Sequence, residues 1–402
     1  MIEISNLRKI CEEGQTILTA DVKSDIERND IEKSIWISVD NKYSFMLNDK
    51  TYDFCLALPL YMAMYYKTDL MICGNVSKKL YRNVVDYIQP IMRSFSPDLE
   101  PVRIMVDGFS EVENSQTVNG TGISCGVDSL ATVYKYYELE KDSEYRLTHL
   151  FFLNCGWHGS INNPVTMELF NKRADEAEKA ANDMNLPLVR VNSNLHAFLY
   201  PLDDQASYFN LYTIVFFLGS AMNRYYLSSS FSYNEVMQYG YKSRGRDFSE
   251  YGDPMTLPLY ANDTTTIVSD GCQYKRSVKT ELIADWKISK KYLNVCCRHS
   301  DDPNVDEKNC SECLKCNRTM VALDAMGKLN EYSEIFDLTK YQKNKKRILF
   351  RLACDYDKDA FSKDNFDFCK QNGMKMPSLK WIIFAKKCKK IIFSPLKIMK
   401  KQ

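Results

Sequence analysis

The chain lacks the features that mark secreted, membrane-spanning and strongly basic proteins. Its 402 residues contain no apolar run of transmembrane length, and Met1–Ser5 carries an acid where a signal peptide would begin its apolar core. The formal net charge is only +1, so bulk electrostatics give no argument for a nucleic-acid partner. Low-complexity segments and internal repeats are also missing. We expect a globular protein of the cytoplasm, long enough for two or three domains.

Two common nucleotide-binding motifs are missing as well. A Walker loop ends in Gly-Lys-Ser/Thr and a dinucleotide fingerprint reads G-x-G-x-x-G, and the chain has neither. What it has instead is a run of small residues, Thr121–Ser129, which reads TGISCGVDS. An apolar, β-branched stretch at 101–106 precedes it, and apolar residues at helical spacing follow from Leu130. The loop is therefore predicted to connect a strand to a helix.

Such a loop suits a phosphate group. Backbone N–H groups at a helix start have no intrahelical partner and lie at the positive end of the helix dipole. Asp128 is expected to hold a Mg²⁺ ion that bridges the phosphates. A turn that merely requires small residues is the alternative. The predicted nucleotide contacts are Ser124, Cys125, Gly126, Val127, Asp128 and Ser129, with Asp128 and Ser129 as the catalytic residues.

Cysteine is plentiful and clustered. Fourteen cysteines without an export signal indicate a reducing compartment, so clustered ones are better interpreted as metal ligands than as disulfides. Cys310, Cys313 and Cys316 are spaced as zinc ligands are, and one upstream thiol would complete a tetrahedral site. We expect Cys296 rather than Cys297 in that place. A structural Zn²⁺ is the simpler prediction, while an iron–sulfur cluster and a chance grouping stay open.

Strands and helices alternate between about 113 and 270. Apolar runs at 147–153, 188–191 and 224–227 are typical of buried parallel strands. The predicted fold class is α/β, a doubly wound parallel sheet with ligands at the carboxyl ends of its strands. Polar segments follow each strand and would line one edge: 124–129, 154–158, 192–194 and 228–230. His158, in the second of these, is either a base or phosphate contact or a solvated loop residue.

Three regions are predicted along the chain. Residues 1–112 are expected to form an α+β accessory module, with strands at 34–39 and 43–47. Residues 113–330 would form the nucleotide-binding domain, including the zinc segment 296–316. Residues 331–402 form a basic tail whose last part mixes lysines with apolar residues and holds no acid from Trp381 onward. The tail would dock on a membrane surface or a protein partner, or simply pack as an ordinary helix.

Ser124–Ser129 resembles the Ser-Gly-Gly-x-Asp-Ser loop of the PP-loop ATP pyrophosphatases. An upstream cysteine, Cys-x-x-Cys-x-x-Cys and the following Asn317–Thr319 are similar to 7-cyano-7-deazaguanine synthase. The likeness covers about 115–330, and the extra terminal segments look more like queuosine-synthase-like proteins of polysaccharide or antiphage-defence loci. It implies ATP and Mg²⁺, and adenylation of a substrate oxygen with release of pyrophosphate. Cys125 stands where that loop has a glycine, a costly replacement if the position needs a positive φ.

The leading hypothesis is thus an ATP-dependent, AMP-forming enzyme that activates a carboxylate or amide oxygen of a small molecule or polymer end. One alternative keeps this chemistry but directs it at a nucleobase or tRNA. A second is a degenerate PP-loop protein that binds nucleotide as a scaffold subunit, which the Cys125 replacement favours. The substrate, its nitrogen or sulfur donor and any homo-oligomer are not readable from the sequence.

Overall fold

The computed structural model describes residues 1–26, 32–110, 117–156, 163–199, 203–239, 248–296 and 309–382. The described residues divide into two compact units, one ending at Tyr274 and one beginning at Lys275. This division differs from the boundaries expected at 112 and 330, because the first unit contains both the N-terminal segment and the loop at Thr121–Ser129. Among the described residues, no helix is long and apolar enough to cross a membrane.

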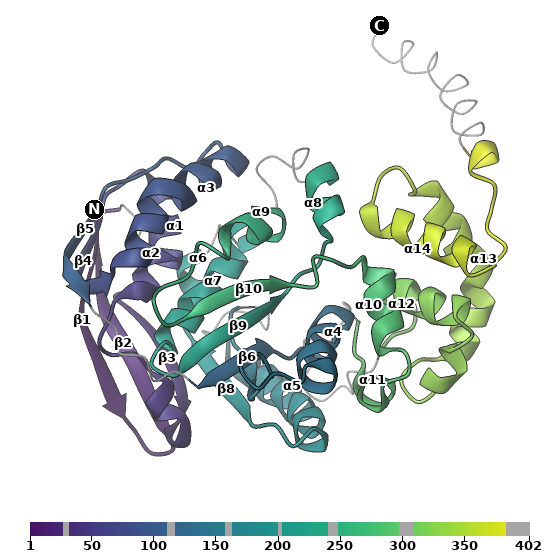
Figure 1. Cartoon of the computed structure of the whole chain (residues 1–402), viewed down its shortest axis with the longest axis horizontal. Coiled ribbons are helices and arrows are strands. Elements are labelled where there is room, and N and C mark those ends of the chain that lie inside the picture. Colours follow the sequence, from purple (N-terminus) through teal and green to yellow (C-terminus); the bar gives the residue numbers. More distant parts are fainter. Residues whose placement is uncertain are drawn as a thin grey trace, which may run out of the picture. The chain divides into compact units, whose positions relative to one another are not determined.

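The first unit is built on a ten-stranded mixed sheet with the order β10-β9-β6-β7-β8-β3-β2-β1-β4-β5 (Figure 1). The strands at both ends of this order pair in parallel, and antiparallel strands lie between them. The strands are β1 (Ile2–Cys11), β2 (Gln15–Ser24), β3 (Ser34–Asp40), β4 (Leu70–Ser77), β5 (Ile104–Ser110), β6 (Val118–Gly122), β7 (His149–Leu153), β8 (Leu188–Ser193), β9 (Met222–Ser228) and β10 (Thr266–Asp270).

Strand β6 lies where the strand order reverses. The chain runs from β6 to β7 and β8 on one side, then returns to β9 and β10 on the other side of β6. All four pairings in this part of the sheet are parallel, so the carboxyl ends of the five strands meet at one edge. In open α/β sheets, ligands bind outside the carboxyl ends at such a switch point. The end of β6 is the switch point of this sheet.

The N-terminal strands continue this sheet. β1 and β2 form an antiparallel hairpin, β2 pairs with β3, and β3 pairs antiparallel with β8, where Ile37 lies opposite Ser193. Asn194 reinforces this junction, because its side chain accepts from the Trp36 N–H (2.9 Å) and donates to the Ser34 carbonyl (2.7 Å). The N-terminal segment thus extends the sheet that carries the loop.

Helices cover both faces of the parallel strands. Phe151 and Phe152 are neighbours in β7 and point to opposite faces. Phe151 belongs to the core that includes α7, while the Phe152 ring lies 5.4 Å from that of Phe170 in α5. The helices of this unit are η1 (Asn41–Met46), η2 (Asp53–Leu56), α1 (Leu58–Tyr66), α2 (Lys78–Asn83), η3 (Val84–Ile88), α3 (Gln89–Phe95), α4 (Val127–Tyr134), η4 (Lys135–Leu139), α5 (Pro164–Asp183), α6 (Leu195–Leu199), α7 (Asp203–Phe217), α8 (Tyr233–Tyr239) and α9 (Phe248–Thr256).

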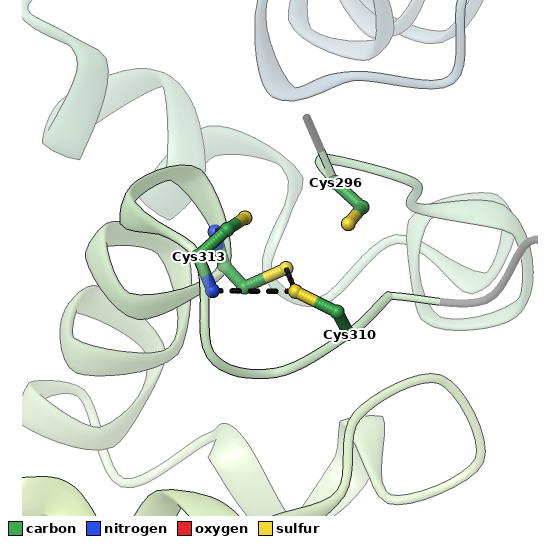
Figure 2. Close-up of side chains that lie close together, drawn as sticks. Cys296, Cys310 and Cys313 are labelled. Carbon is green, nitrogen blue, oxygen red and sulfur yellow. Dashed lines mark hydrogen bonds between the residues drawn. The ribbon is translucent and has the colours of Figure 1, made fainter. Parts of the chain in front are cut away.

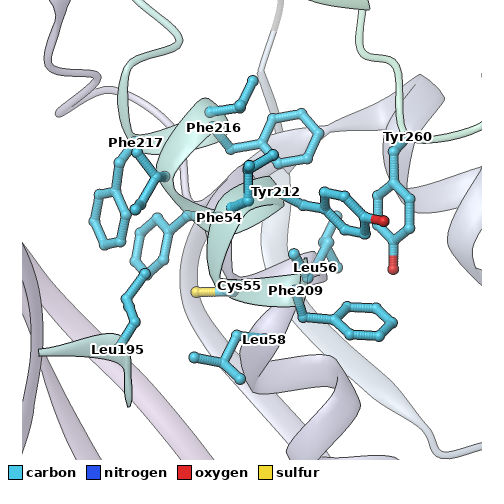
Figure 3. Close-up of a cluster of buried hydrophobic side chains, with 14 of the residues drawn as sticks. Phe54, Cys55, Leu56, Leu58, Leu195, Phe209, Tyr212, Phe216, Phe217 and Tyr260 are labelled. Atoms are coloured by element: carbon cyan, nitrogen blue, oxygen red, sulfur yellow. The ribbon is translucent and has the colours of Figure 1, made fainter. Parts of the chain in front are cut away.

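Aromatic residues fill the core under α7 (Figure 3). The rings of Phe54 and Phe217 stack with centroids 4.0 Å apart, which fastens η2 to the end of α7. The Thr213 hydroxyl accepts from the Leu58 N–H (3.0 Å), so it satisfies an orphan donor at the start of α1. Each fully buried aromatic or aliphatic side chain contributes about 1.5–3 kcal/mol to folding.

The second unit is helical over its described residues. α12 packs against α10 and α14, and α13 packs against α14. Asp364 in α14 accepts from both the N–H (2.8 Å) and the hydroxyl (2.6 Å) of Ser277, which fastens α14 to the first turn of α10. The helices are α10 (Arg276–Ile283), α11 (Lys287–Tyr292), α12 (Leu314–Ala325), η6 (Leu329–Tyr332), α13 (Leu338–Cys354) and α14 (Ala360–Gln371). The basic run expected in the tail lies within α13, while 383–402 lies outside the described residues.

Two expected strands are placed differently. The stretch 43–47 is not a strand: it belongs to η1, in which the buried residues Tyr43 and Met46 are spaced by one 3-10 turn. The stretch 101–106 does not lead into the loop, because its strand begins at Ile104 and pairs with β4 as β5. The strand that leads into the loop is β6.

Ser77 stands before α2 but does not cap it with its side chain. Its hydroxyl donates instead to the buried carboxylate of Asp53 (2.5 Å), which also accepts from the Asn262 amide (2.9 Å). Burial raises the pKa of Asp53 above its usual range. The serine therefore stabilises a contact between distant segments rather than a helix end.

Candidate functional site: the strand-end loop and the four-cysteine group

The loop, Ile123–Gly126, connects the end of β6 to the start of α4. Strand β6 is short and rich in glycine because its neighbours leave no room for side chains. A Cβ atom at Gly120 would lie 2.3 Å from the Phe151 ring, and one at Gly122 would lie 3.1 Å from the Tyr225 hydroxyl. The Ile123 N–H donates to the Phe151 carbonyl (2.9 Å), so the loop begins against β7.

Ser129 is the hub of the loop. Its hydroxyl donates to the Gly126 carbonyl (3.2 Å) and lies 3.4 Å from the Ser124 N–H and 3.2 Å from the Ser124 hydroxyl. The Ser124 hydroxyl in turn accepts from the Gly126 N–H (3.4 Å). Ser124 is exposed, whereas Ser129 is buried. The loop is thus held together by hydrogen bonds among its two serine hydroxyls and its own backbone groups. Ser124 faces solvent.

Cys125 adopts the left-handed conformation, with φ of 56°. This is the backbone region that glycine enters without steric cost and that other residues enter at about 1–2 kcal/mol. The loop thus has a positive φ at Cys125, the condition that makes a residue other than glycine costly there. Burial, helped by the charge of Glu176, raises the pKa of the Cys125 thiol to about 12. A thiol that stays neutral at physiological pH is a poor nucleophile.

Asp128 lies in the first turn of α4 and is partly exposed. Gly126 precedes the helix in an extended conformation, and its carbonyl accepts from the Leu130 N–H (2.9 Å). An acid in the first turn is favoured by the helix dipole. Ser124, Gly126, Asp128 and Ser129 therefore lie on one short loop and turn, as the sequence predicts.

Helix α4 is held in place by Asp270, the last residue of β10. Its buried carboxylate accepts from the Thr132 hydroxyl (2.9 Å), the Lys135 ammonium (2.5 Å) and the Tyr136 hydroxyl (3.1 Å). The Tyr136 ring stacks on Tyr226 of β9 at 3.7 Å. Asp270 thus anchors the helical segment that follows the loop.

The other strand ends form part of the same edge. Asn154, after β7, donates to the Asn192 side chain of β8 (2.7 Å), and the Ser193 hydroxyl donates to the Asn154 carbonyl (2.6 Å). The Ser228 hydroxyl, at the end of β9, is buried and has no hydrogen-bond partner within the described chain. His158 lies outside the described residues. Arg276 and Lys279 lie in α10 of the second unit.

The second candidate site is a group of four cysteines in the second unit (Figure 2). The sulfur atoms of Cys296, Cys310, Cys313 and Cys316 all lie within 4.8 Å of one another. The four thiols predicted as metal ligands are thus brought together. Cys297, the alternative fourth ligand, lies outside the described residues.

Local structure explains how Cys296 reaches the other three. The Asn309 side chain accepts from the Val295 N–H (2.8 Å) and donates to the Leu293 carbonyl (2.8 Å), so it ties the Cys296 segment to the residue before Cys310. Ser311 has φ of 59°, which turns the chain sharply between Cys310 and Cys313. Cys313 then caps α12, and its sulfur accepts from the Cys316 N–H (3.4 Å).

The geometry of the four-cysteine group fits a tetrahedral metal ion. The sulfurs of Cys310 and Cys316 are 3.9 Å apart, and sulfurs bound at about 2.3 Å to one tetrahedral Zn²⁺ are about 3.8 Å apart. The Cys313 N–H donates to the Cys310 sulfur (3.2 Å), a contact that favours the thiolate. Without an ion, burial raises the pKa of Cys316 far above its usual range, so this thiol stays protonated. These four cysteines can hold a metal ion.

Comparison of the chain with protein-family models, with curated proteins and with solved structures found no match.

Proposed function

We propose that this protein is an ATP-dependent enzyme of the PP-loop kind, which transfers AMP to a substrate oxygen and releases pyrophosphate. The observation that carries the proposal is the place of Ser124–Ser129. The loop follows the strand at which the sheet order reverses, opens a helix, and holds two serines and an acid on one turn. This is the position at which open α/β sheets bind phosphate groups.

In the proposed reaction, an oxygen of a carboxylate or amide attacks the α-phosphorus of ATP. The bond from that phosphorus to the bridging oxygen breaks, and pyrophosphate leaves with the electron pair. Backbone N–H groups and the Ser124 hydroxyl would stabilise the charge that grows on pyrophosphate. Asp128 would hold Mg²⁺, which neutralises phosphate charge. No protein nucleophile is needed, in agreement with the raised pKa of Cys125.

We propose zinc as the ion of the four-cysteine group. Four thiols with no carboxylate or histidine among them suit a closed, structural Zn²⁺ site. The ion would join the segment at Cys296 to the start of α12, two pieces of chain that are separated along the sequence. This role is structural and independent of the nucleotide chemistry.

A second candidate function is a nucleotide-binding scaffold without catalysis. The observation that favours it is Cys125, a side chain at a left-handed position where glycine would allow the closest approach of phosphate. Its sulfur is buried beneath the loop, and only 7% of the residue is exposed. The two candidates agree on ATP binding and differ on pyrophosphate release.

Calorimetric titration of Mg²⁺ and ATP into the full chain tests the proposal. We expect binding by the wild type and by Cys125→Gly, and loss of binding with Asp128→Asn. Asp142→Asn, which removes an exposed acid of the same unit, is the matched control and should bind normally. If the folded wild type and Cys125→Gly both fail to bind, the nucleotide proposal is wrong.

Detection of AMP and pyrophosphate in the presence of candidate acids separates the two functions. Pyrophosphate that forms only with an acid present supports the enzyme. Binding by the wild type without turnover, together with turnover by Cys125→Gly, supports a scaffold that has diverged from an enzyme.

A further inference from the structure

Helix α13 carries concentrated positive charge on one side. Lys343, Lys346 and Arg347 are exposed and lie at the spacing of a single helix face, which we call the cationic face. Ile348 and Leu352, on the opposite side of the helix, are buried. The sequence of the helix, 338–354, contains no acid. One side of α13 therefore packs within the second unit, and the other side presents cations to solvent.

The charge of the cationic face is not neutralised by neighbouring acids. Other cations of α13 have acidic partners: Lys345 pairs with Asp324 (2.7 Å), and Arg351 pairs with Asp355 (3.7 Å). Within the part of the chain that the structure describes, no ion pair reaches any of the three residues of the cationic face. Exposed charges of one sign, held on a helix, attract a surface of the opposite sign.

Two large aromatic side chains accompany this charge. Phe350 lies one turn after Arg347 on the same face and is 55% exposed. Trp381 is 72% exposed, and the next residue, Ile382, belongs to a small apolar cluster that includes Ala353 at the end of α13. Exposed aromatic rings among cations are typical of surfaces that meet lipid head groups, where the ring lies at the boundary of the apolar layer.

The composition of the chain beyond Trp381 favours a lipid surface over a nucleic acid. Groups of large apolar residues, IIF at 382–384 and again at 391–393, are interspersed with lysines, and no acid occurs before the end at Gln402. Residues 383–402 lie outside the described residues, so only their composition enters here. A nucleic acid would neutralise the lysines but would leave the apolar groups in water. An anionic bilayer offers both negative charge and an apolar phase.

We propose that the second unit docks on an anionic lipid bilayer through the cationic face of α13, Phe350 and Trp381. The cations lie against the lipid phosphate groups, and the two rings enter the head-group layer. The lysine-rich sequence after Trp381 adds to the same contact. None of these residues belongs to the loop or to the four-cysteine group, so docking does not depend on the proposed nucleotide chemistry.

Co-sedimentation of the full, metal-loaded chain with lipid vesicles tests the proposal. We expect at least about tenfold tighter binding to vesicles with about one third phosphatidylglycerol than to vesicles of phosphatidylcholine alone. The combined variant Lys343→Gln, Lys346→Gln and Arg347→Gln should weaken binding to the anionic vesicles at least about tenfold, because each cation near such a surface contributes about fivefold.

The matched control changes the net charge equally but elsewhere. Lys50→Gln, Lys67→Gln and Lys78→Gln, combined in one variant, remove three exposed lysines of the first unit and should change vesicle binding less than about twofold. Equal weakening by the two triple variants would mean that net charge, not the cationic face, determines binding, and would overturn the proposed surface.

Tryptophan fluorescence tests whether the aromatic side chain enters the lipid layer. Anionic vesicles should shift the emission of the wild type to shorter wavelength. Trp381→Phe keeps an aromatic ring, so it should bind within about twofold of the wild type but lose this shift. A shift that persists in Trp381→Phe would contradict the placement of Trp381 at the membrane.

The choice of partner is tested by the wild type itself. If the folded chain fails to bind anionic vesicles, or binds phosphatidylcholine vesicles equally well, the proposal is wrong. Binding of single-stranded RNA without binding of vesicles would assign the cationic face to a nucleic acid and would overturn the proposal as well.

Discussion

The loop at Ser124–Ser129 and the four-cysteine group differ in what holds them together. The loop closes on itself through hydroxyls and backbone groups, with Ser129 at its centre. The sulfurs of Cys310 and Cys316 lie 3.9 Å apart, and Cys316 is buried where an ionised thiol is unfavourable. A self-bonded loop keeps its shape before a ligand arrives. A cluster of buried thiols gains its shape and its stability from the ion that it binds.

The anchoring of the two sites differs in the same way. The helix after the loop is fixed to the sheet by Asp270 through three side chains, one of them charged. The segment with Cys296 is tied to the Cys310 segment through the Asn309 side chain, which is neutral. We infer that the first unit is preorganised for its ligand and that the second unit depends on metal.

Removal of one thiol should have the largest effect. We expect Cys313→Ser to lower the metal content and to destabilise the second unit by at least about 3 kcal/mol, because structural zinc contributes its binding energy to folding. Metal analysis and thermal unfolding measure the two quantities. Cys354→Ser, a half-buried cysteine of α13 outside the group, is the control and should keep its metal. Full metal content in Cys313→Ser would contradict the four-ligand site.

Loss of the Asp270 contacts that hold α4 should have the second largest effect on stability. Asp270→Asn removes the charge that faces Lys135 and weakens three hydrogen bonds, so we expect a loss of about 2–3 kcal/mol in the stability of the first unit. Lys135 is 34% exposed and can turn to solvent, which limits the cost. Chemical denaturation measures this loss of stability. A stability equal to that of the wild type would mean that the sheet, not Asp270, positions α4.

Loss of the Ser129 hydroxyl should reduce stability less. Ser129→Ala removes the hydroxyl that joins Gly126 to Ser124, and we expect a cost of about 1–2 kcal/mol. Ser124→Ala leaves the Ser129–Gly126 contact in place and should cost less than half as much. If the two variants are equally stable, the loop does not depend on Ser129 as its centre.

The smallest effect concerns Cys125. Glycine removes more atoms than alanine, yet Cys125→Gly should be about 1 kcal/mol more stable than Cys125→Ala, because only glycine relieves the left-handed backbone. The reverse order, measured by thermal unfolding, would show that packing outweighs backbone strain at this position.

The same cysteine should give the loop a distinct pH dependence. The pKa of its thiol is raised from about 9 to about 12 on folding. Its contribution to stability is therefore present below about pH 9 and is lost as the pH rises toward 12. Alkylation of the native protein at pH 8 should modify the exposed Cys11 well before Cys125, as peptide mass spectrometry would show. Equal rates would mean that the loop opens readily.

The sequence predicted the α/β class and the grouping of four cysteines. The two-residue spacing of Cys310, Cys313 and Cys316 at a helix start brings their sulfurs together, whereas Cys296 was a preference over Cys297 as the upstream ligand. The loop was found through its small residues, and the structure adds the positive φ at Cys125. Residue patterns were thus sufficient to find groups whose members lie close together in the sequence.

Features that depend on contacts between residues far apart in the sequence could not be predicted. Strand β6 escaped prediction because its glycines give no apolar signal, although Gly120 makes room for Phe151 of the next strand. The pairing of β3 with β8 joins residues far apart in the sequence, such as Ile37 and Ser193, and no local pattern predicts it. The alternation of Ile2 and Ile4 at the start of β1 was a signal that could have been used.

The most direct test of the contrast between the two sites is hydrogen–deuterium exchange of the full chain before and after removal of metal with a chelator. The account predicts that peptides from α12 exchange at least about tenfold faster without metal, while peptides covering Ile123–Tyr134 do not change. Unchanged exchange in α12 would contradict a structural metal site. Faster exchange in both regions would contradict the claim that the loop keeps its shape by its own hydrogen bonds.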